Sequence, residues 1–403
     1  MPWFILAEMV PKRSAKPVAT PSDLADHLAV VIDVALVRTL IAEQFPEWAD
    51  LPVSPVAVGG NDNRTFHLGD TMTVRLPSAE GYVASVAKEQ RWLPVLAPHL
   101  PQPIPAPLAF GKPGAGYPWP WSVNRWLDGA TARHETATDG AAAHGTATHG
   151  AATRAAATPG STTHRAAAQA ITTHHDTTTN DTPTNGAPTN GAPTNGAPTN
   201  GAPTNGAPTN GAPTNGAPTN GAPADGVVTD LSAFAVDVAE FLIALQAVDT
   251  GGEPAAGEHS FWRGAALSHY DEETRRAIAA LDGRIDAAKA TAEWDAALAA
   301  EWHGRPVWFH GDVANGNLLV RDGRLAGVID FGTSGVGDPA CDLVIAWTFL
   351  DAPARTAFRT TTGVDDATWQ RGRGWALWKA LIQLAENNDN TVVAREIDVL
   401  LGS

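Results

Sequence analysis

Hydrophobic and polar positions in the first part of the chain follow first a helical and then a strand-like pattern. Residues 31–47 repeat apolar side chains at the spacing of an amphipathic helix, which Pro46 ends. Apolar and polar residues then alternate, between Gly or Asp turns, in VSPVAVGG, RTFHLGD and TMTVRLP. A second helix is expected from about Tyr82 to Leu96, before the Pro-rich extended run LPQPIPAPLAFG and the strand-like WSVNRWL. The pattern predicts a small antiparallel sheet that carries one inserted helix.

The part of the chain after residue 225 is patterned mainly as helices. Within TDLSAFAVDVAEFLIALQAV, apolar residues recur at a 3.6-residue period: Leu231, Phe234, Val238, Phe241, Leu242, Leu245 and Val248. Thr229 or Asp230 offers an N-cap for this helix. Further helical patterns occupy roughly 271–301 and 368–387. We therefore expect a mostly helical second half that a short group of strands interrupts.

Residues 130–225 have no hydrophobic pattern. The segment contains no Leu, Val, Met, Phe, Tyr or Trp, and PTNGA repeats in eight consecutive copies from Pro183 to Ala222. A five-residue period with Pro and Asn-Gly in each unit cannot bury enough surface to offset its ordering entropy. We expect a long disordered insertion here. The expected organisation is an extension at 1–20, an N-lobe at 21–129, the insertion at 130–225 and a C-lobe at 226–403.

A predicted hairpin interrupts the helices of the second half. The apolar runs LLV and LAGVID are joined by RDGR, whose Asp322-Gly323 is a strong signal for a two-residue turn. A third apolar run, VWF, comes shortly before them. If the residues that flank the turn pair with each other, the register places Asn317 opposite Val328.

Three polar side chains are thereby expected at one end of this hairpin. Asp330 lies two residues beyond the Asn317–Val328 pair, and the loop that bears Asp312 leads into the same end. Mg²⁺ prefers hard oxygen ligands, commonly one or two carboxylates together with phosphate oxygens and waters. Asn317 and Asp330 suit that need, while Asp312 is left to accept a hydroxyl proton. Each residue alone reads as an ordinary turn or strand-end residue, but H-G-D-x4-N, a hairpin and D-F-G together favour a phosphoryl-transfer site.

The motifs HGDVANGN, VIDFG and GVGDPACDL resemble those of the aminoglycoside phosphotransferase family of small-molecule kinases. The resemblance covers almost all of the chain outside residues 130–225 and the N-terminal extension. It implies an α+β, two-lobed protein-kinase-like fold, with a small antiparallel-sheet N-lobe, a mostly helical C-lobe and ATP held between them. It also implies that Asp312 is the catalytic base and that His310 orients its loop. Asn317 and Asp330 are the implied Mg²⁺ ligands.

The phosphate side of the nucleotide site is expected in the first sheet. Gly60, Asn61 and Asn63 belong to a turn where a kinase places its phosphate-covering loop, although the GxGxxG pattern is missing. Arg75 in TVRLP stands where kinases carry a Lys that grips the phosphates. Its expected partner is Glu89 in the following helix. Because Arg can make bidentate bonds to both carboxylate and phosphate, the replacement is chemically workable.

The segment WPWSVNRWLDG is expected to join the two lobes. By the resemblance, its backbone near Asn124 to Trp126 hydrogen-bonds the purine ring. Any side chain permits such backbone bonds, so the sequence does not distinguish ATP from GTP.

Two acids in GDPACDLVIAW are interpreted as structural. Asp338 precedes Pro339 and an apolar helical run, as an N-cap does when Pro occupies the first helical position. Asp342 is interpreted in the same way. Cys341 between them is expected to be a small core residue rather than a nucleophile.

Composition and charge narrow the class of partner. The formal net charge of −16 argues against nucleic acid or an anionic membrane as the main partner, and the single Cys fits a reducing compartment. No stretch of apolar residues reaches the length of a membrane span. In MPWFILAEMVPKRS the basic residues follow the apolar run, which is the wrong order for a signal peptide. We expect a cytoplasmic protein.

The expected acceptor is a small molecule with a hydroxyl group. A polycationic aminoglycoside would suit the acidic second half, which offers Asp271, Glu272, Glu273, Asp351, Asp365 and Asp366. A macrolide, a choline-like alcohol and homoserine are alternative acceptors. A different class of function, a non-catalytic binding module with a kinase fold, is opposed by the complete set of Asp312, Asn317 and Asp330.

Overall fold

Five antiparallel strands build the sheet of the N-lobe, in the order β1-β2-β3-β5-β4. The computed structural model describes residues 31–56, 62–134, 226–251, 255–387 and 389–402. The strands are β1 (Val53–Pro55), β2 (Asn63–Leu68), β3 (Met72–Pro77), β4 (Pro107–Gly111) and β5 (Trp121–Arg125). The described residues of this lobe form two α-helices, α2 (Val34–Gln44) and α3 (Val83–Leu96). This confirms the predicted antiparallel sheet with one inserted helix, α3.

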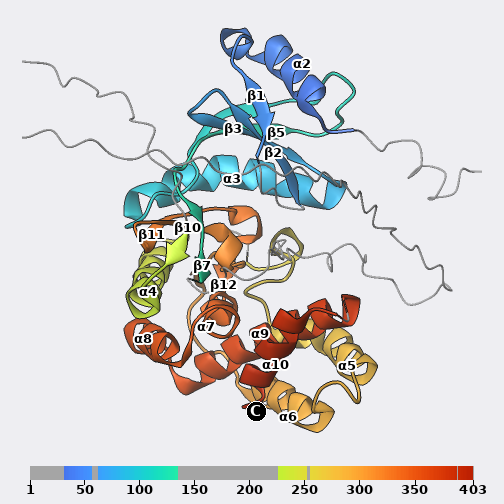
Figure 1. Cartoon of the computed structure of the whole chain (residues 1–403), viewed down its shortest axis with the longest axis vertical. Helices are drawn as coiled ribbons and strands as arrows, with labels where there is room; N and C mark the ends of the chain where they lie inside the picture. The colour runs from blue at the N-terminus through green and yellow to red at the C-terminus, as the bar shows by residue number, and fades with distance from the viewer. Residues whose placement is uncertain (1–30, 57–61, 135–225, 252–254, 388, 403) are drawn as a thin grey trace, which may run out of the picture. The chain divides into compact units, whose positions relative to one another are not determined.

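The two faces of the sheet have different roles because side chains alternate along each strand. On β3, Met72, Val74 and Leu76 are buried in a core that α2 completes, whereas Arg75 points to the opposite face. There Arg75 meets Glu89 of α3. Figure 1 shows α2 and α3 on opposite sides of the sheet. One face therefore stabilises the lobe, and the other presents polar groups to the site.

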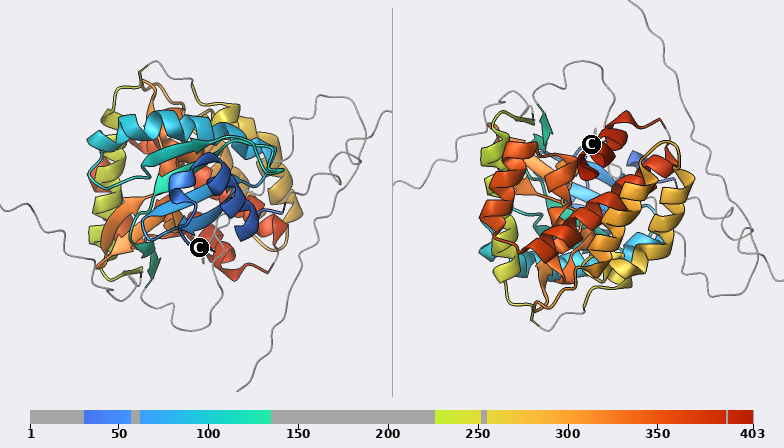
Figure 2. Two further views of the ribbon diagram at one scale, coloured as in Figure 1. Left: turned by 90° about the horizontal axis from the view of Figure 1, so that it is seen from above. Right: turned by 90° about the horizontal axis from the view of Figure 1, so that it is seen from below.

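The C-lobe consists mainly of helices. They are α4 (Leu231–Ala247), α5 (Asp271–Ala280), α6 (Ala287–Ala299), α7 (Ile345–Thr348), α8 (Ala352–Thr362), α9 (Asp366–Glu386) and α10 (Thr391–Leu400). Helix α9 packs against α5, α6 and α10, and Figure 2 shows these helices together on the side away from the five-stranded sheet. The pattern at 271–301 was predicted as one helical region, but Gly283 has a positive φ of 79° and separates α5 from α6.

Aspartates begin four of the C-lobe helices. The side chains of Asp230, Asp286, Asp351 and Asp365 each accept a hydrogen bond from the backbone N–H three residues further on. Such N-caps satisfy backbone donors that the helix itself leaves unpaired. The predicted start of α4 is confirmed, with Asp230 rather than Thr229 as its cap.

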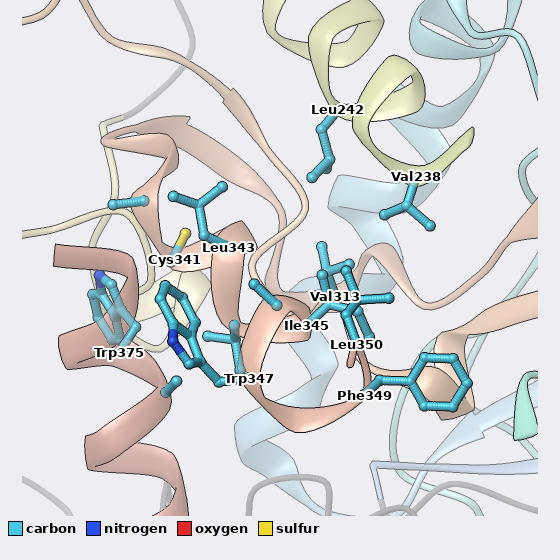
Figure 3. Close-up of a cluster of buried hydrophobic side chains, with 14 of the residues drawn as sticks. Val238, Leu242, Val313, Cys341, Leu343, Ile345, Trp347, Phe349, Leu350 and Trp375 are labelled. Carbon is cyan, nitrogen blue, oxygen red and sulfur yellow. The ribbon is translucent and has the colours of Figure 1, made fainter. Parts of the chain in front are cut away.

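A large apolar core joins the helices to the loops of the site. Val238 and Leu242 of α4 face Leu343 and Ile345, while Trp375 of α9 lies on the other side of the same segment (Figure 3). The core also includes residues of α3, so the inserted helix of the N-lobe is packed against the C-lobe. The loops that bear Asp312 and Asp330 are therefore built on a packed apolar core.

The hairpin of β10 (Leu318–Arg321) and β11 (Arg324–Val328) forms as predicted around Asp322-Gly323, both of which have positive φ. Its register differs by one residue from the prediction beyond the turn. A bulge between Leu319 and Val320 shifts the pairing, so Val328 lies opposite Leu318 instead of Asn317. Asn317 pairs with the next residue, because its carbonyl accepts the N–H of Ile329 at 2.9 Å.

Short strands complete the lobe around this hairpin. Strand β9 (Val307–Phe309) pairs with β12 (Gly335–Gly337), and β6 (Ala130–Thr131) pairs with β10. Strand β7 (Arg133–His134) runs parallel to β8 (Val227–Val228). No helix among the described residues is long and apolar enough to cross a membrane.

The predicted insertion begins too early. Residues 130–134 belong to β6 and β7, and the N–H of Ala132 donates to the carbonyl oxygens of Asn315 and Leu318. These bonds involve the backbone and need only a small side chain, so the lack of large apolar residues does not exclude a strand here. Residues 135–225, which include the PTNGA repeats, lie outside the described residues, as does the extension at 1–20.

Candidate active site

The loop that bears Asp312 is held by a buried carboxylate. Asp342 accepts the backbone N–H of His310 at 2.8 Å and that of Gly311 at 2.6 Å. Gly311 has a φ of 86°, and a Cβ there would come within 2.7 Å of the Thr333 carbonyl oxygen. The glycine of the H-G-D motif is thus required by both its backbone conformation and its surroundings. Asp342 has the structural role that was predicted for it, and that role acts directly on the loop.

His310 fixes the orientation of Asp312 through its imidazole ring. The ring is fully buried, and its Nδ1 accepts the backbone N–H of Asp312 at 3.2 Å. Nε2 must then carry the proton, which it donates to the carbonyl oxygen of Ile329 at 3.0 Å. His310 therefore links the loop to the residue that precedes Asp330.

The Asp312 carboxylate is buried and accepts a hydrogen bond at each oxygen. Asn317 Nδ2 donates to its Oδ2 at 3.0 Å, and Lys379 Nζ contacts its Oδ1 at 3.0 Å. The amide of Asn317 also donates to the backbone carbonyl of Asp312. These bonds fix the plane of the carboxylate.

Asn317 and Asp330 both line one cavity and keep oxygen atoms available to it. The Asn317 amide nitrogen is occupied by Asp312, and its Oδ1 has no hydrogen-bond partner among the described residues. Asp330 Oδ1 accepts from Arg75, while its Oδ2 has no partner there either. Asp330 adopts a φ of 66°, a left-handed conformation that Asp tolerates better than most residues. The two predicted ligands thus meet at one end of the hairpin despite the shift in register.

Arg75 bridges the sheet, α3 and the hairpin. Its guanidinium lies 3.0 Å from Glu89 Oε2 and 2.9 Å from Asp330 Oδ1. Burial alone lowers the pKa of Arg75, but the two carboxylates more than offset this effect and raise the pKa. The predicted Arg75–Glu89 pair is therefore present, and Asp330 joins it.

The cavity beside Arg75 has a volume of about 370 Å³ and lies between the five-stranded sheet and the hairpin. Its lining includes charged and amide groups of Asp62, Asn63, Arg75, Asn317 and Asp330. It also includes apolar side chains of Val56, Pro105, Leu127, Leu319 and Ile329. This mixed lining suits a ligand with both an apolar and an anionic part.

Asn124 and Trp126 line the same cavity, and two backbone N–H groups of this segment are engaged in pairing. The N–H of Trp126 donates to Thr71 and that of Arg125 to Ala106, both at 2.8 Å, because strand pairing continues to this point. The expected purine contact of the backbone at 124–126 stays a prediction and would have to use other backbone groups. The Asn124 side chain is 2% exposed, and neither its amide oxygen nor its amide nitrogen has a partner among the described residues.

The turn that should cover phosphates is only partly described. Gly60 and Asn61 lie outside the described residues, whereas Asn63 begins β2 and is buried beside the cavity. Asp62 next to it has a pKa raised to about 7, first by burial and then by repulsion from the carboxylates of Asp330 and Asp312. Several acids therefore face this cavity together, an arrangement that a bound cation would stabilise.

Asp338 and Cys341 behave as predicted for structural residues. Asp338 Oδ1 accepts the N–H of Ala340 and caps η9 (Pro339–Val344), with Pro339 at its start. Its carboxylate also forms a buried ion pair with Arg371 of α9, at 2.7 Å. Burial raises the pKa of the Cys341 thiol well above its usual value, so the thiolate is not formed at neutral pH.

The acidic residues that were considered for a cationic acceptor have other partners. Asp351 and Asp365 cap helices, and Trp378 Nε1 donates to Glu273 at 3.0 Å. The remaining three pair with arginines: Asp271 with Arg275, Glu272 with Arg276 and Asp366 with Arg359. None of the six is among the residues that line the two cavities beside Asp312.

Lys379 is the site residue that sequence reasoning missed. It lies on α9, one helical turn after Trp375, in a part of the helix where Leu377, Trp378 and Leu381 are buried. The signal was a single charge within the apolar run WALWKALIQL. A buried lysine needs a charged partner, but the pattern does not show that this partner is 67 residues earlier in the chain.

Comparison with known proteins identifies one matching family and several solved structures of similar fold. The model of the family described as "Phosphotransferase enzyme family" matches residues 53–181 and 221–375, well over half of the chain. No curated protein matches the sequence.

Solved structures with the same fold include the GDP and kanamycin complex of APH(2")-IIia. It is 16% identical with a TM-score of 0.54, and the alignment covers 90% of this chain and 96% of that one. The GDP complex of wild-type aminoglycoside 2'-phosphotransferase-IIIa is 14% identical with a TM-score of 0.51, covering 92% and 97%. These similarities confirm the expected two-lobed kinase-like fold.

Proposed function

The chain belongs to the phosphotransferase enzyme family, and from this premise we propose that it transfers the γ-phosphoryl group of ATP to a hydroxyl group of a small molecule. One observation carries the proposal. The buried Asp312 is held at both oxygens beside a cavity where Asn317, Asp330 and Arg75 converge. Phosphoryl transfer requires a positioned base and compensation of phosphate charge, which these groups supply.

The large cavity suits a purine nucleotide. Its apolar lining would hold the base, and the amide of Asn124, which has no partner among the described residues, would supply a donor and an acceptor for the edge of that base. Leaving both atoms of a buried amide unpaired costs free energy, so a ligand that pairs them is favoured. Arg75 would meet the phosphates. Both ATP and GTP offer the required chemistry, and we propose ATP as the donor.

The donor set also suits Mg²⁺. Asn317 Oδ1 and Asp330 Oδ2 are hard oxygen atoms on the same cavity without other partners among the described residues. We assign these two side chains as its protein ligands. When bound with the nucleotide, the ion would neutralise phosphate charge.

Asp312 is proposed to orient the acceptor. Its backbone is fixed by His310 and its carboxylate by Asn317, so the carboxylate has a defined orientation. A hydroxyl group that donates to this carboxylate is placed for attack on the γ-phosphorus and can pass on its proton. Most of the acceleration would come from this positioning, because the transfer needs little covalent chemistry from the protein.

The acceptor is proposed only as a class, a small molecule with a hydroxyl group. One protein of the same fold binds kanamycin, which makes an aminoglycoside a candidate. The six acids that seemed suited to such a cation are occupied elsewhere, so they give this candidate no support. A macrolide, a choline-like alcohol and homoserine therefore stay in the panel of candidates. The presence of Asp312, Asn317 and Asp330 together also argues against a non-catalytic binding module.

The test is ATP consumption by the wild type and by Asp312→Ala, each with a panel of aminoglycosides, macrolides, choline and homoserine. We expect at least one acceptor to stimulate turnover by the wild type, and none to stimulate the variant. Absence of stimulation across the whole panel would count against the enzyme, and equal stimulation of both proteins would remove the role of Asp312. Binding of Mg-ATP to the variant serves as a control for folding.

A further inference from the structure

Lys379 is placed where an acceptor must bind. Its ammonium contacts Asp312 Oδ1 at 3.0 Å, and the side chains of this pair are 14% and 5% exposed. An acceptor hydroxyl that donates to the same oxygen would lie about 5 Å from the ammonium nitrogen, because two donors that share one acceptor atom approach it along different lone-pair directions. The lysine thus neighbours the oxygen that would receive the phosphoryl group.

The Lys379 ammonium group has more N–H donors than it uses within the described residues. Lys379 has three N–H donors, and Asp312 is the one hydrogen-bond acceptor it contacts among the described residues. Glu396 of α10 also lies close enough for the lysine charge to lower the pKa of its carboxyl group, although burial raises that pKa to about 7. Two N–H donors therefore remain for a ligand.

The space in front of this pair is small. A cavity of about 10 Å³, enough for one water, is lined by Asp312, Lys379, Trp375, Trp378 and Arg263. The Arg263 guanidinium is held over the Trp378 ring at 4.4 Å. An atom that enters this space would contact both Asp312 and Lys379.

The contribution of the Lys379–Asp312 ion pair to folding stability does not by itself explain its presence. Taking two charges out of water costs about as much as their attraction returns, and well-packed apolar side chains are often as stable or more so. The surrounding face of α9 is already aromatic and aliphatic, so a leucine or methionine would fit the core there. A buried lysine at this position is better explained by chemistry than by packing.

We propose that Lys379 is a catalytic residue that binds the acceptor oxygen and the phosphoryl group in transfer. This inference rests on the proposed phosphotransferase function and extends it to a residue on α9. In the reaction, the acceptor oxygen forms a bond to the γ-phosphorus while the bond from that phosphorus to the β,γ-bridging oxygen breaks. The hydroxyl proton passes to Asp312, and ADP leaves with the bridging oxygen. Lys379 stays protonated and donates its free N–H groups to the oxygens on which negative charge grows.

The experiment compares Lys379→Met and Lys379→Arg with the wild type in the full chain. Turnover is measured with water as acceptor, as Mg-ATP hydrolysis, and with whichever panel acceptor stimulates the wild type most. We expect Lys379→Met to lower kcat about 10²- to 10³-fold per folded molecule, with the KM for Mg-ATP changed by less than about threefold. Lys379→Arg keeps the charge and should recover part of that loss.

Two controls separate catalysis from stability. Lys289→Met removes an exposed lysine of α6 that pairs only with Asp286 at its own helix start, and should leave kcat unchanged. The double variant Asp312→Asn with Lys379→Met removes both charges, which avoids an unpaired buried acid. If the two residues act together, adding Lys379→Met to Asp312→Asn should cost less than about threefold. Thermal melting and Mg-ATP binding report the folded fraction of every variant.

The outcomes distinguish this inference from the function on which it rests. An active wild type beside a Lys379→Met protein whose kcat per folded molecule stays within about threefold would overturn the role of Lys379 alone. The role of Lys379 would also be overturned if adding Lys379→Met to Asp312→Asn lowered kcat as much as Lys379→Met lowers it in the wild type. A wild type that hydrolyses no Mg-ATP and phosphorylates no acceptor would overturn the proposed function, and this inference with it.

Discussion

The two sides of the Asp312 loop differ in the space they offer and in how far their polar groups are paired. On one side, the cavity of about 370 Å³ presents oxygens of Asn317 and Asp330 and an amide of Asn124 that have no partner within the described part of the chain. On the other, the space is about 10 Å³, and Asp312 is paired with Lys379. We call these the donor side and the acceptor side.

This difference indicates that the binding site for the phosphoryl donor is preformed, whereas the site for the acceptor is not. Unpaired buried groups on the donor side mark places that a ligand must satisfy, so the chemistry of that ligand can be inferred from them. On the acceptor side the protein satisfies its own charges, and any acceptor larger than a water must displace side chains there. The phosphoryl donor is therefore the better defined of the two substrates.

The largest effect on the donor side should come from Asp330→Asn. Loss of the carboxylate removes both a Mg²⁺ ligand and a partner of Arg75, so kcat/KM should fall by at least about 10³-fold. Asp322→Asn is a matched control, because Asp322 also has a positive φ but lies in the hairpin turn. Comparable activity of the two variants in a steady-state assay would show that Asp330 binds no metal.

Arg75 should affect binding of the nucleotide more than the chemical step. Arg75→Met is expected to raise the KM for Mg-ATP roughly 10- to 100-fold, and Arg75→Lys to raise it less, because a lysine keeps the charge but loses the bidentate geometry. Arg64→Met, on the neighbouring strand and exposed, is the control. Equal KM values for the Met and Lys variants would mean that the charge at this position does not contact phosphate.

Asn124 should set the preference between purines. In Asn124→Asp the carboxylate can only accept hydrogen bonds, which suits the N–H groups of guanine and not the ring acceptor of adenine. We expect the ratio of the ATP to the GTP dissociation constant to rise by roughly tenfold. Titration calorimetry measures both constants without an acceptor, and Asn124→Leu should weaken both nucleotides alike. An unchanged ratio would place the base away from Asn124.

Asp62 should make the stability of the protein fall as pH rises. Its pKa in the folded state, about 7, lies above the ordinary value of 3.8, so the folded protein holds a proton that the unfolded chain releases. This contribution is fully present below pH 3.8 and is lost as pH rises through about 7. Between roughly pH 5 and 8, melting temperature should decline more for the wild type than for Asp62→Asn. If the melting temperatures of the two proteins changed in parallel with pH, Asp62 would not be destabilised by burial and by the neighbouring carboxylates on the donor side.

The smallest effect is expected from deleting residues 135–225. Strands β7 and β8 on either side of this segment are hydrogen-bonded neighbours, so a Gly-Ser linker of about eight residues can join them. We expect the melting temperature to change by less than about 3 °C and Mg-ATP affinity to stay the same. A large loss of melting temperature or of Mg-ATP affinity would show that residues 135–225 contribute to the donor side or the acceptor side.

Sequence predicted the donor side better than the acceptor side for a physical reason. Asp312, Asn317 and Asp330 are brought together by one local hairpin, whose turn residues identify it. The bulge at Leu319 was not predictable because it changes the pairing without changing the alternation of side chains. It moved the register by one residue but left the polar groups at the same end.

Contacts that are distant in the chain escaped prediction. Lys379 meets Asp312 only after α9 packs on the C-lobe core, and no local pattern encodes that meeting. The engagement of the backbone N–H groups of Arg125 and Trp126 was also not predicted, because the extent of strand pairing depends on neighbours elsewhere in the sequence. The Arg75–Glu89 pair was found because the position of a basic residue on a strand and an acid on the next helix is shared by kinase folds.

The most direct test of the central claim follows the γ-phosphoryl group itself. Wild type and Asp312→Asn, both saturated with γ-³²P-labelled Mg-ATP, are mixed with the panel acceptor that stimulates the wild type most, and the label is traced in a single turnover. The account predicts that label moves from ATP to the hydroxyl group of the acceptor in the wild type and stays in ATP in the variant. Label that reaches the acceptor at equal rates in both proteins, or that never leaves ATP in the wild type, would contradict it.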